Sequence, residues 1–338
     1  MDAPSPLPSL PPPLPAYNDR RTGLLIFGIL EIILGVMCGL MLPLMVLGQV
    51  MAAKKNGVEF NLTFALPTLV IFAALAVGLI WLGVGSIQAR RWARALLLCL
   101  GWMGLCVGVI TLAVMIPTLG SMDEVMRQQG RPMPPGALAI AKIFAAAMIT
   151  VIYVVIPGAL VLFYRTTDVK LTCEARDPVE RWTDRCPLPV LAMVILQVCG
   201  GACVALMPRF GAAMPVAGFV LTGWLARVIW MGFAGLSFYA AWGFYRLQPR
   251  AWLIYTITIL AFGVSSTVTF LRVDLLDYYR LIGLPERQIK QIAASPLVHG
   301  HAILWLPGLS VVIFGGYLLY LRRFFPRSGV PADNGQLG

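Results

Sequence analysis

The chain of 338 residues is 59% hydrophobic and only 12% charged, with a mean hydropathy of +0.82. Soluble domains carry roughly 25% charged residues, so this composition excludes an ordinary soluble protein and indicates one that lies in a lipid bilayer. The formal charge of +11 does not indicate a nucleic-acid partner, because the basic residues are scattered in ones and twos at the ends of apolar stretches.

The chain begins with a proline-rich segment, residues 1–22, which we expect to be a disordered cytoplasmic tail. A ligand for a proline-binding domain is the alternative interpretation. Arg20 and Arg21 precede an apolar run from Leu24 to Leu47. That run is about twice as long as the core of a signal peptide, so it predicts a first spanning helix.

Eight apolar stretches are each long enough to cross a bilayer at about 20 residues per crossing. The sequence therefore predicts an all-α, polytopic integral membrane protein with spanning helices at 23–47, 65–88, 95–118, 137–164, 188–208, 226–246, 251–271 and 301–321. An even number of crossings puts both termini on one side. Outside the helices that side carries 15 Lys and Arg residues against nine on the other. The positive-inside rule then places the N- and C-termini in the cytoplasm, and we expect the bacterial inner (plasma) membrane.

The two sets of four helices, residues 23–164 and 188–325, resemble tandem copies of one unit. Each unit has an even number of crossings, so both enter the membrane from the same side. We therefore expect two parallel four-helix repeats, related by a two-fold axis along the membrane normal. Three anchors recur in the same order at offsets of 166, 158 and 157, namely Gly35 with Gly201, Gly85 with Gly243 and Gly158 with Gly315.

A polar linker, residues 165–187, joins the two units and holds ten of the 41 charged residues, so it cannot lie in hydrocarbon. Its Cys173 and Cys186 flank Trp182. In the cytoplasm both should be thiols, whereas a disulfide between them would reverse the topology. We expect a plain solvated connector, with a folded plug or docking surface around Trp182 as the alternative. The C-terminal residues 326–338 are expected to be a disordered tail.

Glu31 is the only carboxylate inside a predicted crossing. An ionised carboxylate there costs roughly 2.5–3.5 kcal/mol, so it should be protonated, paired or directed into a polar cavity. The favoured interpretation is an interhelical hydrogen bond or a side chain that reaches toward the headgroups. A proton or cation site is the alternative, with Gln197 as its uncharged counterpart in the second unit.

Lys142 and Arg227 lie near the outer ends of the fourth and sixth helices. Side chains that reach to the headgroups account for both, and a vestibule for an anion is the alternative. The stretch 211–225 is too apolar for an ordinary loop. It predicts either a longer sixth helix or a segment that dips into the bilayer. Between the seventh and eighth helices, residues 285–292 predict a short helix along the membrane surface.

One group of side chains contains ligand types that zinc accepts, namely His299, His301, Asp274 and Asp277. A His-x-His pair is only a partial ligand set, and the sequence has no H-E-x-x-H motif. The metal site is therefore a minor alternative, and we expect no cofactor.

The sequence has no phosphate-binding glycine loop, nucleophile elbow or paired intramembrane aspartates, so it identifies no catalytic residue. It favours a non-catalytic membrane protein with a partner-binding, sensing or assembly role. Besides the lipid bilayer, the expected partner is another membrane protein or a second copy of the chain. A secondary transporter or channel that uses Glu31 is the alternative, and an intramembrane enzyme is the least favoured.

Overall fold

The computed structural model describes residues 17–55, 62–120, 134–206, 208, 213–284, 286, 289, 293 and 302–326. Within these residues, seven helices are long and apolar enough to cross a membrane. They are α1 (Arg21–Lys55), α2 (Leu62–Ile87), α3 (Arg91–Gly120), the continuous rod of α5 (Pro135–Thr150), η1 (Val151–Val155) and α6 (Ile156–Tyr164), then α8 (Leu188–Leu206), α9 (Gly223–Tyr245) and α10 (Pro249–Arg272). A further helix, α14 (Ala302–Leu321), consists of 20 mostly apolar residues and packs beside α10.

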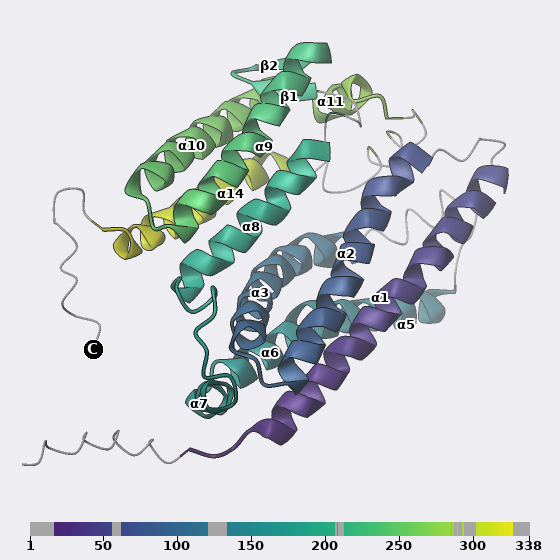
Figure 1. Ribbon diagram of the computed structural model, residues 1–338. Coiled ribbons are helices and arrows are strands. Elements are labelled where there is room, and N and C mark those ends of the chain that lie inside the picture. The colour runs from purple at the N-terminus through teal and green to yellow at the C-terminus, as the bar shows by residue number, and fades with distance from the viewer. Residues whose placement is uncertain are drawn as a thin grey trace, which may run out of the picture.

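The helices run back and forth between two ends of the molecule (Figure 1). At one end, the linker end, lie the start of α1, the α2–α3 and α9–α10 turns, the short helix α7 (Thr167–Arg176) and the 3-10 turn η3 (Arg322–Phe324). At the other, the hairpin end, lie the strands β1 (Ala213–Val216) and β2 (Phe219–Thr222) and the helix α11 (Leu275–Leu281). Large apolar side chains such as Leu162 and Ile140 are exposed on the sides of the helices, as expected for a surface that faces lipid.

The prediction of a longer sixth helix is wrong for residues 213–222, and the alternative, a segment that dips into the bilayer, stays a prediction. Here β1 and β2 pair as an antiparallel hairpin with Val216 opposite Phe219, and α9 begins directly after it at Gly223. Side chains of α10 satisfy the free backbone donors of the turn: Ser265 Oγ accepts from Ala217 N at 2.7 Å, and Thr269 Oγ1 accepts from Gly218 N at 2.9 Å. These bonds satisfy the polar backbone of the turn, which is why an apolar segment can form a hairpin at this end.

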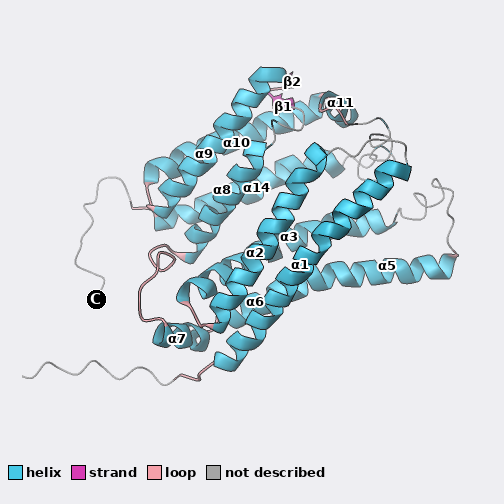
Figure 2. Ribbon diagram, turned by 45° about the vertical axis from the view of Figure 1, so that its right-hand side comes forward, coloured by secondary structure: helices cyan, strands magenta, loops and turns pink. Residues whose placement is uncertain are grey.

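The rod of α5, η1 and α6 contains a π-helical turn because of Pro157. Proline has no N–H, so it cannot donate to the carbonyl of Tyr153, four residues before it. Helix α3 packs against this site through Gly108, where a Cβ atom would collide with the Tyr153 carbonyl oxygen. The α5 part of the rod leans away from the other helices (Figure 2).

The two halves use the same order of helix pairs. In the first half α1 packs on α2 and α3 packs on α6, while in the second half α8 packs on α9 and α10 packs on α14. In the first pair of each half, a glycine allows the helices to come close. Gly35 lies against Ala76 and Ile80 of α2, and Gly201 lies against Ala234 and Phe238 of α9.

The turns at the linker end also correspond. In α2–α3, Ala89 has φ +52° and Arg90 N donates to Gly85 O at 2.9 Å. In α9–α10, Leu247 has φ +51° and Gln248 N donates to Gly243 O at 2.8 Å. Both turns place a residue other than glycine in the left-handed backbone region just after a helix. The corresponding residues of the two turns, such as Ala89 and Leu247, are 158 positions apart.

The halves meet where α3 lies beside α8. Ala95 and Cys99 of α3 are buried in one core cluster with α8 residues that include Val190 and Leu191. The Cys99 thiol donates to the backbone oxygen of Leu188 at 3.6 Å. Helix α10 corresponds to α3, and α1 corresponds to α8. In the described part of the chain, α10 does not pack against α1 as α3 packs against α8 (Figures 1 and 2). A two-fold axis would bring α10 to α1 just as it brings α3 to α8, so the described contacts do not support the expected two-fold relation between the halves.

Candidate functional site: a buried carboxyl cluster covered by the linker

Glu31 lies in α1, ten residues from its first residue and thus about 15 Å along the helix axis at 1.5 Å per residue. Its side chain is buried between three helices. Oε1 of Glu31 lies 3.2 Å from the hydroxyl of Tyr164, the last residue of α6. The Tyr164 hydroxyl lies 2.6 Å from Ser86 Oγ near the end of α2, and Ser86 Oγ donates to the Leu24 carbonyl of α1 at 3.0 Å. We call Glu31, Tyr164 and Ser86 the carboxyl cluster.

Counting hydrogens assigns the charge state of the carboxyl cluster. Three oxygen–oxygen contacts run in series from Glu31 to the Leu24 carbonyl, and each hydrogen bond needs one hydrogen. The hydroxyls of Tyr164 and Ser86 supply two of them. The third must come from the carboxyl of Glu31, which is therefore neutral when all three bonds form. No ion pair to Glu31 exists among the described residues, which agrees with a neutral acid in an apolar site.

The second oxygen of the carboxyl, Oε2, is buried and has no hydrogen-bond partner among the described residues. Such an oxygen can still accept a hydrogen bond from one more donor. The carboxyl cluster thus has three hydrogen bonds and one unused acceptor, Oε2 of Glu31.

The linker covers the carboxyl cluster at the linker end. Val169 and Cys173 of α7 are buried in the same core cluster as Tyr164 and Leu24. Thr172 Oγ1 accepts from the backbone N of Arg20 at 3.1 Å, which ties α7 to the start of α1. The linker is therefore folded, and the expectation of a plain solvated connector is wrong. The reason is that one side of α7, which includes Val169 and Cys173, is apolar and packs against the first half at the linker end.

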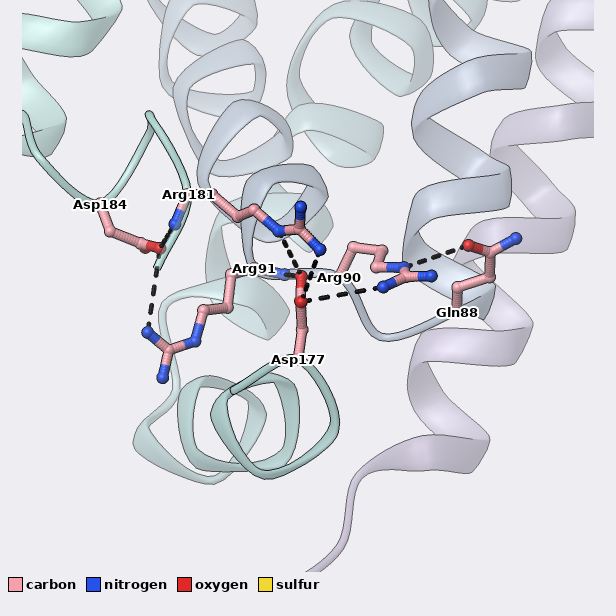
Figure 3. Close-up of polar contacts among 6 residues, drawn as sticks. All are labelled: Gln88, Arg90, Arg91, Asp177, Arg181 and Asp184. Atoms are coloured by element: carbon pink, nitrogen blue, oxygen red, sulfur yellow. Dashed lines mark hydrogen bonds and ion pairs between the residues drawn. The ribbon is translucent and has the colours of Figure 1, made fainter. Parts of the chain in front are cut away.

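Asp177 fastens the linker to the α2–α3 turn (Figure 3). Its carboxylate is almost fully buried and accepts two hydrogen bonds from the Arg181 guanidinium, at 2.9 and 3.2 Å. It also accepts from the backbone N of Arg91 at 3.4 Å and lies 3.7 Å from the guanidinium of Arg90. The hydrogen bonds from Arg181 hold the pKa of Asp177 below its ordinary value.

A second carboxylate continues this ion-pair network. Asp184 accepts from the backbone N of Arg181 at 2.9 Å and lies 3.9 Å from the guanidinium of Arg91. We call Asp177, Asp184, Arg90, Arg91 and Arg181 the linker latch. It joins the middle and the C-terminal part of the linker to the α2–α3 turn.

The linker also touches the second half. The hydroxyl of Tyr245, the last residue of α9, donates to the backbone oxygen of Trp182 at 3.1 Å, and the two rings lie 6.4 Å apart. The Trp182 ring remains half exposed, and Val179, three positions earlier in the linker, is exposed. The linker thus presents exposed apolar side chains at the linker end, near its contact with the second half.

Cys173 and Cys186 are both free and buried. Burial raises the pKa of each thiol to about 11. Neither cysteine is exposed, so the linker surface expected around Cys173, Trp182 and Cys186 consists of Trp182 alone among these three.

The remaining predicted site residues do not join the carboxyl cluster. Gln197 is buried in α8, where its amide lies 4.0 Å from the Met193 sulfur and beside Tyr255. Arg227 is exposed four residues into α9, at the hairpin end, and Lys142 is half-buried in α5. These positions fit side chains that reach to the headgroups.

Among the described residues no group of three or more His, Cys, Asp and Glu side chains is placed to hold a metal ion, and only the two aspartates of the candidate zinc site are described. Asp274 Oδ1 accepts from Leu276 N at 2.8 Å and caps α11, and Asp277 pairs with Arg280. His299 and His301 lie outside the described residues, as does most of the helix expected at 285–292.

Sequence reasoning missed Tyr164, Ser86 and Asp177. Tyr164 and Ser86 end apolar helices, where tyrosine and serine are common and signal nothing by spacing. Asp177 is one of five acidic residues in the linker, and no pattern distinguishes it. Comparisons with protein-family models, with curated proteins and with solved structures find no match to this chain.

Proposed function

We propose that this chain is a non-catalytic integral membrane protein that binds or senses a partner, and that the folded linker is the surface offered to that partner. The observation that carries the proposal is the closed environment of Glu31. Its buried carboxyl contacts Tyr164, which in turn contacts Ser86, and α7 covers the cluster at the linker end. A carboxyl placed in this way holds helices and linker together.

The sequence beyond Glu31 supports this choice over transport. Toward the hairpin end, α1 from Ile32 to Gly48 and α2 from Leu69 to Gly85 contain no Asp, Glu, Lys, Arg, His, Asn or Gln. A path for ions or polar solutes needs polar groups along its length. After Glu31, α1 therefore has no such side chain before Gln49, near its other end.

We infer further that the chain crosses the membrane eight times, as two tandem four-helix repeats. The matching turns at Ala89 and Leu247 and the matching contacts of Gly35 and Gly201 support the repeat. The length and composition of α14 support the eighth crossing. The charge distribution supports a cytoplasmic linker end in a bacterial inner membrane.

A secondary transporter for a proton or a small cation is the second candidate. The unpaired Oε2 of Glu31 favours it, because an open acceptor on a buried carboxyl is a binding position. In this case the linker would open and close access to Glu31 from the linker end.

Two measurements on the purified full chain test the proposal. The first is ion and proton flux in sealed vesicles that contain the wild-type protein or Glu31→Gln. We expect both to match empty vesicles. Flux by the wild type that Glu31→Gln abolishes would replace our proposal with the transporter.

The second measurement is photo-cross-linking in whole cells, with a photoreactive amino acid at Trp182. We expect one discrete adduct, because the half-exposed Trp182 lies in the proposed contact surface. The matched control is the same amino acid at Leu162, which is exposed on α6 and should give lipid adducts only. Equal adducts at the two positions would remove the linker as the partner surface.

A further inference from the structure

The contact between α3 and α8 buries one face of each helix. Ala95 and Cys99 of α3, four residues apart, are 5% and 2% exposed. On α8, Leu188 receives the thiol hydrogen bond of Cys99, and Leu191, three residues further on the same face, is fully buried. We call these four residues the junction.

In the second half, α10 occupies the place of α3. The offset of 158 aligns Ala95 with Leu253 and Cys99 with Ile257, yet Leu253 and Ile257 are 51% and 59% exposed. The loss of burial is confined to this face. The aligned pairs Ala93 with Ala251 and Leu97 with Tyr255 are buried in both halves.

Helix α1 shows the complementary difference. The offset of 166 aligns Leu188 with Thr22 and Leu191 with Leu25. Leu25 is 43% exposed, and Thr22 and Ile29 on the same face are exposed too. Within one chain nothing described brings α1 to α10, and Figures 1 and 2 place them on different sides of the molecule.

We propose that α1 of a second copy of this chain packs against the exposed face of α10. This contact between two chains would repeat the contact that α3 and α8 make within one chain. The inference rests on the proposed tandem repeat. It pairs two exposed faces with each other. One is the face of α10 with Leu253 and Ile257, and the other is the face of α1 with Thr22 and Leu25.

Both faces of the proposed contact carry large, exposed apolar side chains, namely Leu253 and Ile257 on α10 and Leu25 and Ile29 on α1. Close packing of such faces is what drives helix association in lipid.

The contact joins two different surfaces, so each copy offers an α1 face and an α10 face. A head-to-tail contact of this kind closes into a ring when the rotation between copies allows it. In a membrane the rotation axis is the bilayer normal, so every copy keeps the same orientation. The expected assembly is therefore a closed ring of chains, with α1 of each copy beside α10 of the next.

Disulfide cross-linking in native membranes tests the contact. Two differently tagged full-length chains are co-expressed, one with Thr22→Cys and the other with Ile257→Cys. The accessible native cysteines are replaced by alanine in both chains, namely Cys38, Cys106, Cys199 and Cys203. On oxidation we expect a covalent dimer that contains both tags, because disulfides form only where the two Cα atoms lie within about 7 Å.

The controls separate the possible results. Replacing Ile257→Cys by Leu162→Cys, at an exposed position on α6, should abolish the mixed dimer. Within one chain, Leu188→Cys should form a disulfide with Cys99 and so report an intact junction. An intact junction without the mixed dimer would overturn the inference, as would dimers in which both chains carry the same tag. Failure of the Leu188→Cys disulfide would overturn it as well, because the junction is its template. None of these results depends on the flux measurement.

Discussion

The hydroxyl of Tyr164 lies 3.2 Å from Oε1 of Glu31, although the two residues are 133 positions apart in the sequence. This hydrogen bond joins α6 to α1 within the first half. Because Tyr164 directly precedes the linker and Glu31 lies inside the apolar part of α1, it also couples the membrane interior to the linker. Substitutions of these residues and of Asp177 test this coupling and the latch that holds the linker in place.

Tyr164→Phe should destabilise the protein. The phenylalanine keeps the ring in its core cluster but leaves the Glu31 carboxyl without its partner, which costs about 1–3 kcal/mol for a buried polar group. Thermal unfolding in detergent measures the change. Tyr153→Phe, at an exposed tyrosine of η1, is the matched control and should leave the unfolding temperature unchanged.

Substitutions of Glu31 should separate its hydrogen bond from its charge. The amide of Glu31→Gln can accept a hydrogen bond from Tyr164 or donate one to it, as a neutral carboxyl can, so we expect unfolding close to that of the wild type. Glu31→Ala leaves a cavity and removes the bond, and should cost about 2–4 kcal/mol. If Gln were as destabilising as Ala, the hydrogen bond of a neutral side chain at position 31 would not stabilise the fold, contrary to the hydrogen count.

The linker latch should weaken at low pH. Hydrogen bonds from Arg181 lower the pKa of Asp177 in the folded protein, so the unfolded linker binds a proton more tightly than the folded one does. The contribution of Asp177 is therefore complete above its unfolded pKa of about 3.9 and is lost as the pH falls through the lower, folded value.

Hydrogen exchange of the α7 amides measures this effect. Asp177→Asn should raise exchange at neutral pH and remove the loss of protection below about pH 4. Glu180→Gln, at an exposed linker position, should exchange as the wild type does. Identical exchange in wild type and Asp177→Asn at neutral pH would show that the latch does not hold the linker.

Thiol labelling should give the orientation of the linker. Val179→Cys is exposed and should react at pH 7.5 with a maleimide that cannot cross membranes, applied to the cytoplasmic side. Cys173 and Cys186 should stay unmodified in the folded protein, because they are buried and their pKa values are raised to about 11. Reaction of Val179→Cys only from the outer side would invert the proposed topology.

The membrane class and the approximate spans could be predicted from the sequence, because long apolar runs have few structural alternatives. The small residues Gly35 and Gly201, which the sequence aligns with each other, both lie at helix contacts that need small residues. Glu31 was found because a carboxylate in an apolar run is rare.

The hairpin and the carboxyl cluster could not be predicted, because they depend on contacts between residues that are far apart in the sequence. The hairpin at Ala213–Thr222 forms because Ser265 and Thr269 of α10, some 50 positions away, satisfy its turn. Ser86 and Tyr164 acquire their roles only when α2 and α6 meet α1. Periodicity within one helix contains no information about such partners.

The accessibility of position 31 tests the account most directly. Glu31→Cys is labelled in sealed vesicles of known orientation with the same maleimide, which is applied to one side at a time. We predict no reaction from either side, and reaction from the linker side once Asp177→Asn releases the linker. Labelling of Glu31→Cys from the hairpin side would contradict the account, because it would reveal a water-filled path through the first half where we infer a closed site.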